Sequence, residues 1–493
     1  MGEEIKDVIK KDNNKETIFN YIVFISSLTL SLILFTKILK NNILSITNNI
    51  LFGILLFILY SVPFYFLYND KVKNDVKRIF TFNLIIIGLF SMVSILLINK
   101  GLDTIGVINT ETKEKITYSL IVRKDSTVNT VNDILKEDEI VYVNENDSEI
   151  NVFQKKIQEK IKENFKYEGK ESYLQLVDEL INNKINVIIL NNSYKQTILE
   201  YMPDFYQKIK IINTLNFERE ETEISKPKVT YDLDSFNIYV AGKDGYGGFE
   251  EIARSDVNVI MSVNPKTEKI LVTTIPRDSY VKIAGKGKNK YDKLTHAGIY
   301  GIDSSIKTLE KFLDTEINYY VKLNFNSFIN VIDNIGGIEV YNPETYKRGK
   351  TIYEKGKLQL NGSEALAFAR ERKQYSEGDF ERGRNHTRII EAVIEKITKN
   401  SSELNYKQLM SMIGKSIKTN MPTDKIIELF NFQMDNKPSW KITKRDIKGK
   451  GSMSLPSYAM PGYKLWMFVP DKKNVKELKK EIKDFLQEEK VNN

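Results

Sequence analysis

The sequence predicts an α/β protein in which three membrane helices precede two domains of alternating strands and helices. Three observations indicate this fold class. Long apolar runs occupy the first hundred residues, strand-like and helix-like segments alternate over the next hundred, and short regular apolar runs separated by turns follow. With 493 residues and 41% hydrophobic side chains, the chain is long enough for more than one compact core.

The three apolar runs at the N-terminus predict transmembrane helices. They comprise Phe19–Thr36, Ile50–Tyr68 and Ile79–Ile98, and each is close to the roughly 20 residues that a spanning helix needs. A cleaved signal peptide does not fit the first run, because two more runs follow and no small-residue cleavage site is present. We therefore assign residues 1–18 to a tail and residues 19–100 to three transmembrane helices.

The positions of the cations predict the orientation of these helices. Four lysines precede the first run, and four more cations lie between the second and the third. By the positive-inside rule, both segments face the cytoplasm. We expect a multi-pass protein of the cell membrane, with its N-terminus in the cytoplasm and everything after Lys100 outside the cell. This location excludes ATP, NADH and nucleic acid as natural ligands of the C-terminal domains.

Residues 110–225 are predicted to form a small extracellular accessory α/β domain. The predicted strands are 118–123, 140–143 and 186–190, and the predicted helices are 131–137, 150–165 and 173–180. No catalytic combination of residues is present in this region. The charged run 217–228, which ends in a Lys-Pro-Lys sequence, is predicted to be a linker.

Residues 231–490 are predicted to form the catalytic domain, a mixed sheet with helices on its faces. The predicted strands are 236–241, 256–263, 269–275 and 338–341, with the second and third in a hairpin, and the predicted helices are 304–312 and 325–332. Ser363 is expected to cap a short helix over 364–366. Phe368, Arg370 and Arg372 are then expected to alternate along one face of an extended segment.

Composition excludes several kinds of chemistry. The chain has no cysteine, so it has no disulfide, thiolate nucleophile or zinc–thiolate site, and only His296 and His386 offer imidazole. A bound metal would therefore be held mainly by oxygen, which favours magnesium or manganese. No Ser-His-Asp order or GxSxG elbow is present, which argues against acyl transfer. The net charge of +8 is spread over a long chain and does not by itself imply nucleic acid.

Two clusters of arginines and carboxylates predict a site for a pyrophosphate and its metal. One lies within 366–392, where five arginines surround Asp379, and the other combines the segments 254–256 and 276–278. Arginine suits phosphate oxygens because its planar fork is always charged. A single arginine run would be explained by a solvated face with structural ion pairs. Two clusters at matching strand ends, behind a membrane anchor, favour the ligand site.

The ordered motifs of the C-terminal half resemble the LytR–CpsA–Psr family of Gram-positive bacteria. These motifs are Gly242-Lys-Asp244, Ala253-Arg-Ser-Asp256, Ile275-Pro-Arg-Asp278, Asp292-Lys-Leu-Thr-His296, Asn334-Ile-Gly-Gly337, Leu360–Arg372 and Gly378–Asn385. The resemblance covers about half the chain, and the anchor with its accessory domain is similar to the capsule-associated CpsA branch. His386 stands where the family commonly has glutamine, which makes the charge at this position depend on pH.

The resemblance implies an α-β-α sandwich with the activity of an extracytoplasmic glycopolymer–peptidoglycan phosphotransferase. Such enzymes take a capsule polysaccharide, a teichoic acid or a related secondary polysaccharide from a polyprenyl-pyrophosphate carrier. They attach the polymer to peptidoglycan through a phosphodiester bond. The implied partners are therefore the lipid-linked glycopolymer, peptidoglycan and the membrane.

The resemblance also implies a role for each site residue. Phosphate oxygens would be clamped by Arg254, Arg277, Arg370, Arg372 and Arg382, which Asp278 and Asp379 would orient. Substrate would be contacted by Lys293, His296, Asn385 and His386, although His296 taken alone is more typical of a structural histidine. Magnesium or manganese would be held by Asp244 and Asp256, either of which is a candidate general base. We expect Asp256 to be an exposed carboxylate that contributes little to folding.

Three other functions remain open at this stage. A lipid pyrophosphatase would use the same site with water as the acceptor. A non-catalytic protein that binds polyprenyl phosphate or polysaccharide would use the same arginines without turnover. A membrane-bound transcription attenuator is disfavoured, because the predicted cytoplasmic part is a short tail and a loop without a helix-turn-helix.

Overall fold

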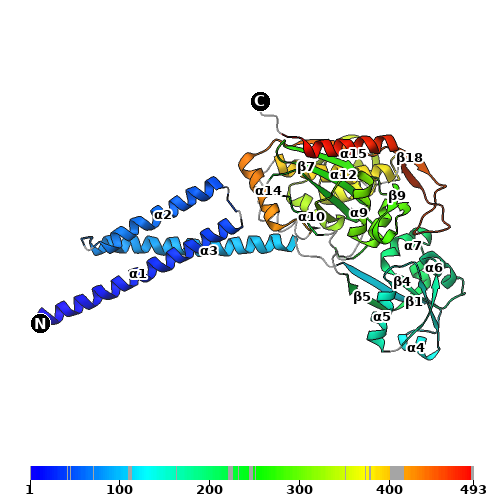
Figure 1. Cartoon of the computed structure of the whole chain (residues 1–493), viewed down its shortest axis with the longest axis horizontal. Helices are drawn as coiled ribbons and strands as arrows, with labels where there is room; N and C mark the ends of the chain where they lie inside the picture. Colours follow the sequence, from blue (N-terminus) through cyan, green and yellow to red (C-terminus); the bar gives the residue numbers. More distant parts are fainter. Residues whose placement is uncertain are drawn as a thin grey trace. The chain divides into compact units, whose positions relative to one another are not determined.

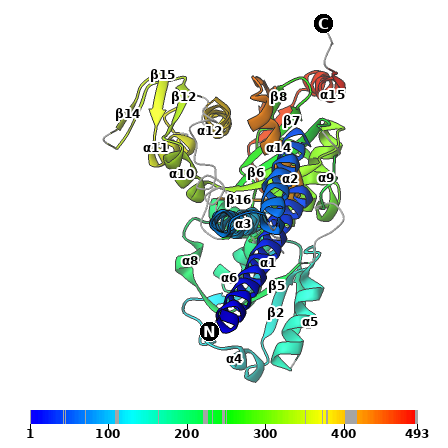
Figure 2. The same cartoon turned by 90° about the vertical axis from the view of Figure 1, so that its left-hand side faces the viewer.

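The computed structural model describes residues 2–41, 43–44, 46–69, 71–108, 114–162, 164–219, 226–230, 233–243, 248–249, 251–349, 351–371, 373–376, 379–399 and 416–489. The chain forms two compact units. One contains residues 1–107 and 422–438, and the other contains residues 108–421 and 439–493. Figures 1 and 2 show both units, with many of their helices and strands labelled.

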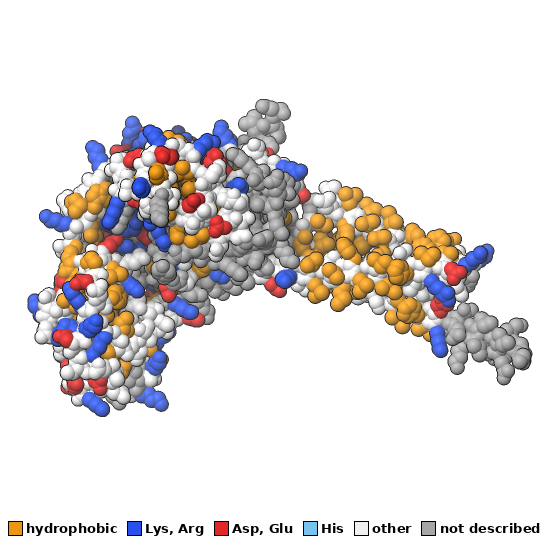
Figure 3. Space-filling view, turned by 180° about the vertical axis from the view of Figure 1, so that it is seen from behind, with side chains coloured by type: hydrophobic (Ala, Val, Ile, Leu, Met, Phe, Trp, Pro, Cys, Tyr) orange, Lys and Arg blue, Asp and Glu red, His pale blue; other side chains and the backbone are white. Residues whose placement is uncertain are grey.

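The first unit is built from long apolar helices. Its elements are α1 (Gly2–Lys40), α2 (Ile46–Tyr68), α3 (Asn74–Ile108) and α14 (Thr423–Asn436). The first three contain segments long and apolar enough to cross a membrane, with mean hydropathies of 2.2, 2.4 and 2.4. Hydrophobic side chains cover most of the face of these helices seen in Figure 3. The three predicted membrane helices are confirmed, and the chain is a membrane protein.

Hydroxyl groups join the three membrane helices inside their bundle. The Ser31 hydroxyl lies 2.7 Å from the Tyr60 hydroxyl and 2.9 Å from the Ser91 hydroxyl, so it bridges α1 to both α2 and α3. Ser27 donates a hydrogen bond of 2.8 Å to the Leu84 carbonyl. Because hydrocarbon offers no water to these groups, their mutual pairing stabilises the bundle.

The N-terminal part of the second unit contains a five-stranded mixed sheet. Its elements are β1 (Lys115–Arg123), α4 (Val131–Lys136), β2 (Ile140–Asn144), α5 (Ile150–Ile161), β3 (Lys166–Lys170), α6 (Tyr173–Ile181), β4 (Val187–Asn191), α7 (Lys195–Tyr201), α8 (Phe205–Lys208) and β5 (Ile209–Glu218). The strand order is β3-β2-β4-β1-β5. β2 runs parallel to β3 and β4, whereas β1 runs antiparallel to β4 and β5. The strands and helices predicted in this region are present, but the helix predicted over 150–165 ends at Ile161.

β3 and β5, the two edge strands of this sheet, were not predicted from the sequence. An edge strand has one unpaired side and more exposed side chains, so its apolar pattern is weak. β5 extends to Glu218, into the run 217–228 that was predicted to be a linker. The next residue, Arg219, forms ion pairs of 3.1 Å with Glu114 and 2.9 Å with Glu149. The linker prediction is therefore wrong for residues 217–219, and residues 220–225 lie outside the described residues.

The C-terminal part of the second unit contains a six-stranded sheet and several short hairpins. Its strands are β6 (Phe236–Lys243), β7 (Val257–Asn264), β8 (Lys269–Thr274), β9 (Tyr280–Ile283), β10 (Lys290–Lys293), β11 (Tyr319–Asn324), β12 (Ile338–Asn342), β13 (Tyr346–Arg348), β14 (Thr351–Tyr353), β15 (Gly356–Leu360), β16 (Ile417–Thr419), β17 (Lys441–Asp446), β18 (Gly449–Ser452) and β19 (Met467–Pro470). Its helices are α9 (Ile302–Leu313), α10 (Phe325–Asn334), α11 (Gly362–Arg370), α12 (Asp379–Lys399) and α15 (Lys472–Gln487).

The six-stranded sheet is mixed and has helices on both faces. Its order is β16-β11-β6-β7-β8-β17, with β6 parallel to β11, β8 parallel to β17, and β7 antiparallel to both of its neighbours. Ile306 of α9 and Ile482 of α15 pack with Tyr239 and Leu271 of the sheet. Figure 2 shows α10, α11 and α12 on the opposite side from α9. This arrangement confirms the α-β-α sandwich and the predicted β7–β8 hairpin.

One local prediction in this domain is wrong. Residues 362–370 form the helix α11, not a short helix followed by an extended segment with Phe368 and Arg370 on one face. The cap is Asn361 rather than Ser363: the Asn361 side chain accepts from the Glu364 amide at 2.9 Å, and the Glu364 carboxylate accepts from the Asn361 amide at 3.0 Å. This capping box, followed by good helix formers, favours a longer helix.

Candidate functional site

Two motif segments meet at one edge of the central sheet. Residues 254–256 lead directly into β7, and residues 277–278 follow the end of β8. Because β7 and β8 are antiparallel neighbours, the start of one strand lies beside the end of the other. A backbone hydrogen bond of 2.8 Å from Asp256 to Gly242 also fixes the first segment to β6. The sheet topology therefore brings together two clusters that are separate in sequence.

Arg277 lies between the two carboxylates of this cluster. Its Nη1 atom donates a hydrogen bond to Asp256 Oδ1, and its Nε atom lies 3.7 Å from Asp278 Oδ1. Lys293, at the end of β10, places its Nζ atom 2.8 Å from the same Asp278 oxygen. All four side chains are largely shielded from water, so loss of one charge would leave its partner buried and unpaired.

Cations keep both aspartates ionised despite their burial. Burial by itself raises the pKa of Asp256, but the positive charges of Arg277, Arg254 and Arg382 hold the pKa below its ordinary value. Burial likewise opposes ionisation of Asp278, and Arg277 and Lys293 lower its pKa. Both groups are therefore carboxylates at neutral pH.

The expectation that Asp256 is exposed is wrong. The residue is only 8% exposed, because it directly precedes a central strand and is enclosed by the loop that ends β8. Its carboxylate belongs to a buried ion pair with Arg277. Replacement of this group will therefore affect folding as well as any activity.

Helix α12 brings further motif residues to the cluster. Arg382, in the first turns of the helix, lowers the pKa of both Asp256 and Asp278, and His386 acts on Asp256 in the same direction. Asn385 is completely buried. Its amide donates 3.2 Å to the Phe368 carbonyl of α11 and accepts 2.6 Å from Arg388. Asn385 thus joins α11 to α12.

Several predicted site residues lie at helix ends or outside the described residues. Arg370 lies half-buried at the C-terminal end of α11. Arg372 and Asp244 lie outside the described residues, and Asp379 opens α12 with a side chain that is not described. The assigned roles of these residues stay predictions.

His296 has the surroundings of a structural histidine. It has no exposed surface, and its Nδ1 atom lies 2.9 Å from Asp292 Oδ1. Asp292 in turn accepts hydrogen bonds of 2.8 Å from the Ser457 hydroxyl and 2.7 Å from the Ala459 amide. The pair therefore fastens the 292–298 segment to a distant loop. Among the described residues, this side chain contacts Asp292 rather than the arginine cluster.

Two residues of α7 contact the arginines and were not predicted from the sequence. Glu200, near the end of α7, lies 2.8 Å from Arg254 Nη1 and 3.5 Å from Arg277 Nη2. Gln196, one turn earlier, accepts a hydrogen bond of 3.2 Å from Arg254 Nε. No local sequence signal marks these residues, because an i, i+4 pair of polar side chains is common on helix surfaces.

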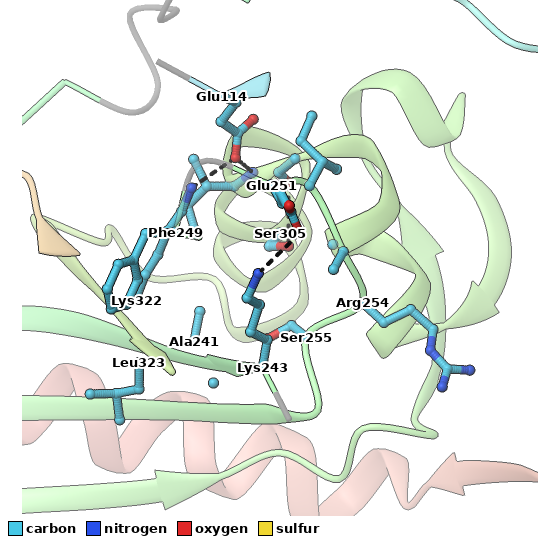
Figure 4. Close-up of a pocket in the computed structure, with 16 residues that line it drawn as sticks. Glu114, Ala241, Lys243, Phe249, Glu251, Arg254, Ser255, Ser305, Lys322 and Leu323 are labelled. Carbon is cyan, nitrogen blue, oxygen red and sulfur yellow. Dashed lines mark hydrogen bonds and ion pairs between the residues drawn. The ribbon is translucent and has the colours of Figure 1, made fainter. Parts of the chain in front are cut away.

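A pocket opens beside the arginine cluster (Figure 4). Its lining includes Lys243, Glu251, Arg254, Lys322 and Glu114. Lys243 and Glu251 are 3.9 Å apart, and Lys322 donates 2.9 Å to Glu114. Figure 4 shows that the Arg254 guanidinium points away from these two pairs. The pocket therefore shares Arg254 with the cluster but presents other polar groups.

The carboxylates of the cluster can be compared with the ligands that magnesium prefers. Within the described ranges, no three His, Asp or Glu side chains are grouped so that they could hold a metal ion by themselves. Asp256 offers one buried carboxylate, shared with Arg277. This fits an ion that keeps waters and is completed by substrate phosphates, which is usual for magnesium. It does not fit an ion held in a cage of protein ligands.

The fold and the site define a membrane-anchored α/β protein with a cationic cluster suited to a phosphorylated ligand. The LytR_cpsA_psr family model matches residues 204–484, which is more than half of the chain. The chain belongs to this family, so the family assignment made from its motifs is confirmed. A second model, for the DNA polymerase processivity factor, matches only residues 73–190. That range begins with the apolar helix α3 and covers about a quarter of the chain.

Similar proteins have been named in several bacilli. The chain is 37% identical over 211 residues to a protein of Bacillus cereus named polyisoprenyl-teichoic acid–peptidoglycan teichoic acid transferase TagU, covering 43% of this chain and 66% of that protein. It is 34% identical over 221 residues to the TagU of Bacillus licheniformis, covering 44% and 70%. The chain thus spans just under two thirds of the length of the B. cereus relative.

Two solved structures of related proteins each cover about half of the chain. The crystal structure of B. subtilis TagU is 29% identical, with a TM-score of 0.41, and covers 52% of this chain and 100% of that chain. A structure of TagT bound to LI-WTA is also 29% identical, with a TM-score of 0.42, and covers 53% and 95%.

Proposed function

We propose that this protein is a glycopolymer–peptidoglycan phosphotransferase. It takes a wall glycopolymer from a polyprenyl-pyrophosphate carrier, attaches it to a peptidoglycan sugar hydroxyl through a phosphodiester bond, and releases polyprenyl phosphate. The observation that carries the proposal is the meeting of Arg254, Arg277, Lys293 and Arg382 around two buried carboxylates at one sheet edge. The activity named for the Bacillus relatives supports it.

The chemistry of the reaction explains why cations dominate this site. The acceptor hydroxyl oxygen forms a bond to the phosphorus next to the sugar, and the bond from that phosphorus to the bridging oxygen breaks. The electron pair leaves with polyprenyl phosphate, and the hydroxyl proton passes to a base. Such transfers depend on in-line positioning and on neutralising charge at phosphate oxygens. Arginine forks can supply both functions.

The surroundings of Asp256 make it a poor general base for the acceptor hydroxyl. Its lowered pKa makes it a weak proton acceptor at neutral pH. Its pairing with Arg277 suits it better to orient that arginine or to hold a metal. Asp256 is therefore a poor candidate for the general base, and the base stays unassigned.

We include a magnesium or manganese ion in the proposal, with Asp256 and Asp244 as its protein ligands. When bound, the ion would neutralise charge on the pyrophosphate oxygens and so assist departure of the leaving group. Arg277 would then share Asp256 with the ion. The chain's lack of cysteine and its burial of both histidines support an oxygen-coordinated metal.

The proposal also includes an orientation. The lysine-rich segments 6–15 and 71–78 would face the cytoplasm, and residues 101–493 would lie outside. The polyprenyl carrier and peptidoglycan are both accessible at that surface, which agrees with the proposed substrates.

The direct test is reconstitution with purified full-length protein in detergent. The protein is incubated with a lipid-linked glycopolymer donor, magnesium and peptidoglycan fragments, and the products are analysed by mass spectrometry. We expect a polymer–peptidoglycan phosphodiester together with polyprenyl phosphate, and loss of both with Arg277→Ala. Formation of free polymer phosphate alone would identify a pyrophosphatase instead. Donor binding without turnover would identify a binding protein.

A further inference from the structure

The arginine cluster is contacted by a residue from outside the family-defining part of the chain. Glu200 lies on α7, which ends at Tyr201, just before the matched range of 204–484. Its carboxylate bridges the two arginines, 2.8 Å from Arg254 Nη1 and 3.5 Å from Arg277 Nη2. A carboxylate in this position makes the same kind of contact that a phosphate group would make.

The guanidinium group of Arg277 faces a carboxylate at each of its three nitrogens. Nη1 meets Asp256, Nε lies 3.7 Å from Asp278, and Nη2 lies 3.5 Å from Glu200. For a phosphate to reach this fork, one carboxylate must move. The Asp256 and Asp278 side chains are 8% and 7% exposed, whereas that of Glu200 is 42% exposed. Glu200 is therefore the carboxylate that can leave Arg277 at the lowest free-energy cost, because water can solvate it after its side chain rotates away.

Arg254 is also contacted by side chains of α7. Its Nη1 atom lies against Glu200, and its Nε atom donates to Gln196 at 3.2 Å. Burial opposes ionisation of the Glu200 carboxyl group. The positive charges of Arg254, Arg277 and Lys293 outweigh this effect and lower the pKa of Glu200. Glu200 thus remains an anion at neutral pH. It offsets one positive charge of the cluster.

Apolar packing fixes the position of α7 against the C-terminal sheet region, and this holds the Glu200 backbone beside the arginines. Ile198 and Thr197 of this helix are completely buried. The same apolar cluster contains Ile299 and Met460 from the C-terminal sheet region. Release of Glu200 then requires rotation of one side chain near the helix end, not separation of the two sheets.

We propose that Glu200 occupies the phosphate position of the arginine site and is exchanged for the pyrophosphate of the donor. This inference rests on the proposed function. Helix α7 then sets the affinity of the arginine site for phosphorylated ligands. An incoming anion must carry enough charge to replace the Glu200 carboxylate. A pyrophosphate, with its higher charge, displaces Glu200 more readily than a singly charged phosphodiester does.

The test compares pyrophosphate binding to full-length variants in detergent by titration calorimetry. Inorganic pyrophosphate with magnesium serves as the probe. Glu200→Gln keeps the shape and removes the charge, so we expect its pyrophosphate affinity to rise about tenfold, allowing for the partial exposure of the pair. Glu200→Asp keeps the charge, and we expect affinity close to that of the unmodified protein. Glu159→Gln, an exposed residue of α5 with the same charge change, is the matched control.

The possible binding results separate the exchange of Glu200 from the proposed function. Tighter binding by Glu200→Gln alone, with a lower KM for the lipid donor, supports the exchange. Equal or weaker binding by Glu200→Gln, in a protein whose binding is abolished by Arg277→Ala, overturns the exchange and leaves the proposed function standing. Weaker binding would mark Glu200 as a positioning residue for Arg254. Absence of pyrophosphate binding in both the unmodified protein and Glu200→Gln overturns the exchange and the proposed function together.

Discussion

At the scale of single residues, Arg277 organises the site because its guanidinium group is surrounded by carboxylates. Asp256 and Asp278 hold it in a buried environment, and Lys293 balances the second of them. Such a network fixes the direction of the arginine fork, and it makes each member sensitive to the loss of another.

The first prediction concerns Asp256→Asn. The change keeps the shape but leaves Arg277 without its buried counter-charge, so we expect loss of transfer and destabilisation by about 3 kcal/mol. Turnover and thermal melting should be measured on the same preparation, with and without EDTA. Asp125→Asn, at an exposed carboxylate of the accessory region, is the control. Full turnover of Asp256→Asn in EDTA would remove the support for both the metal and the ion pair.

The second prediction concerns pH. Arginines lower the pKa of Asp256 in the folded protein, so the folded state favours the carboxylate more than the unfolded state does. The resulting stabilisation is complete above the unfolded pKa of about 4 and is lost as the pH falls through the lower folded value. Melting temperatures between about pH 3 and 7 should fall at the acid end. In Asp256→Asn this acid dependence should be weaker, and an unchanged profile would contradict the assignment.

The third prediction concerns Arg370, at the end of α11. If it clamps a phosphate oxygen, Arg370→Ala should lower transfer by roughly 100-fold, because it removes about 3 kcal/mol of transition-state stabilisation. Arg370→Lys should recover part of the rate, since it keeps the charge and loses the fork. Arg445→Ala, at an exposed site on β17, is the control. Near-normal rates for Arg370→Ala would place this arginine outside the site.

At the scale of elements, the packing of α11 on α12 carries the motif arginines. Arg370 ends one helix, and Arg382 lies in the first turns of the other. Asn385 connects the two helices through the Phe368 carbonyl. The geometry of the arginines therefore depends on a buried amide that need not touch the substrate.

The fourth prediction follows from this connection. Asn385→Ala leaves the Phe368 carbonyl and the Arg388 guanidinium without this partner, so we expect destabilisation of about 1–3 kcal/mol. Thermal melting should show the loss, together with reduced transfer. Gln359→Ala, which removes an exposed hydrogen bond to Glu339 on a neighbouring hairpin, should melt normally. Equal melting of the two variants would show that the amide does not join the helices.

At the scale of the whole molecule, the chain combines a helical membrane anchor with an extensive α/β part. The anchor is held by hydroxyl pairs as well as by apolar packing. The α/β part carries its site at an edge of the central sheet, where two strand ends and helices meet. A membrane anchor agrees with the proposed donor, which is attached to a membrane lipid.

The fifth prediction is the orientation of the chain. Because cations precede the first apolar run and separate the second from the third, we expect residues 101–493 to face outward. Protease added to intact protoplasts should digest this part, and a C-terminal tag should be lost while an N-terminal tag is retained. Complete protection of the C-terminal tag would reverse the orientation and exclude the proposed substrates.

The sequence by itself determined the features that local rules control. Three apolar runs gave the membrane helices, apolar patterns gave the strands β1, β2, β4, β6, β7, β8 and β12 and several helices, and ordered motifs gave the family. These signals are readable because each depends on residues within one helix, strand or short motif. The absence of cysteine likewise limited the possible chemistry without any structure.

Only the tertiary structure decided what surrounds the site. It buried Asp256 and His296, and it brought Glu200 against Arg254 and Arg277. Burial depends on elements distant in sequence, and the Glu200 contacts join residues more than fifty positions apart. No periodicity or propensity extends over that distance, so packing between the two sheets alone determines which carboxylate meets the arginines.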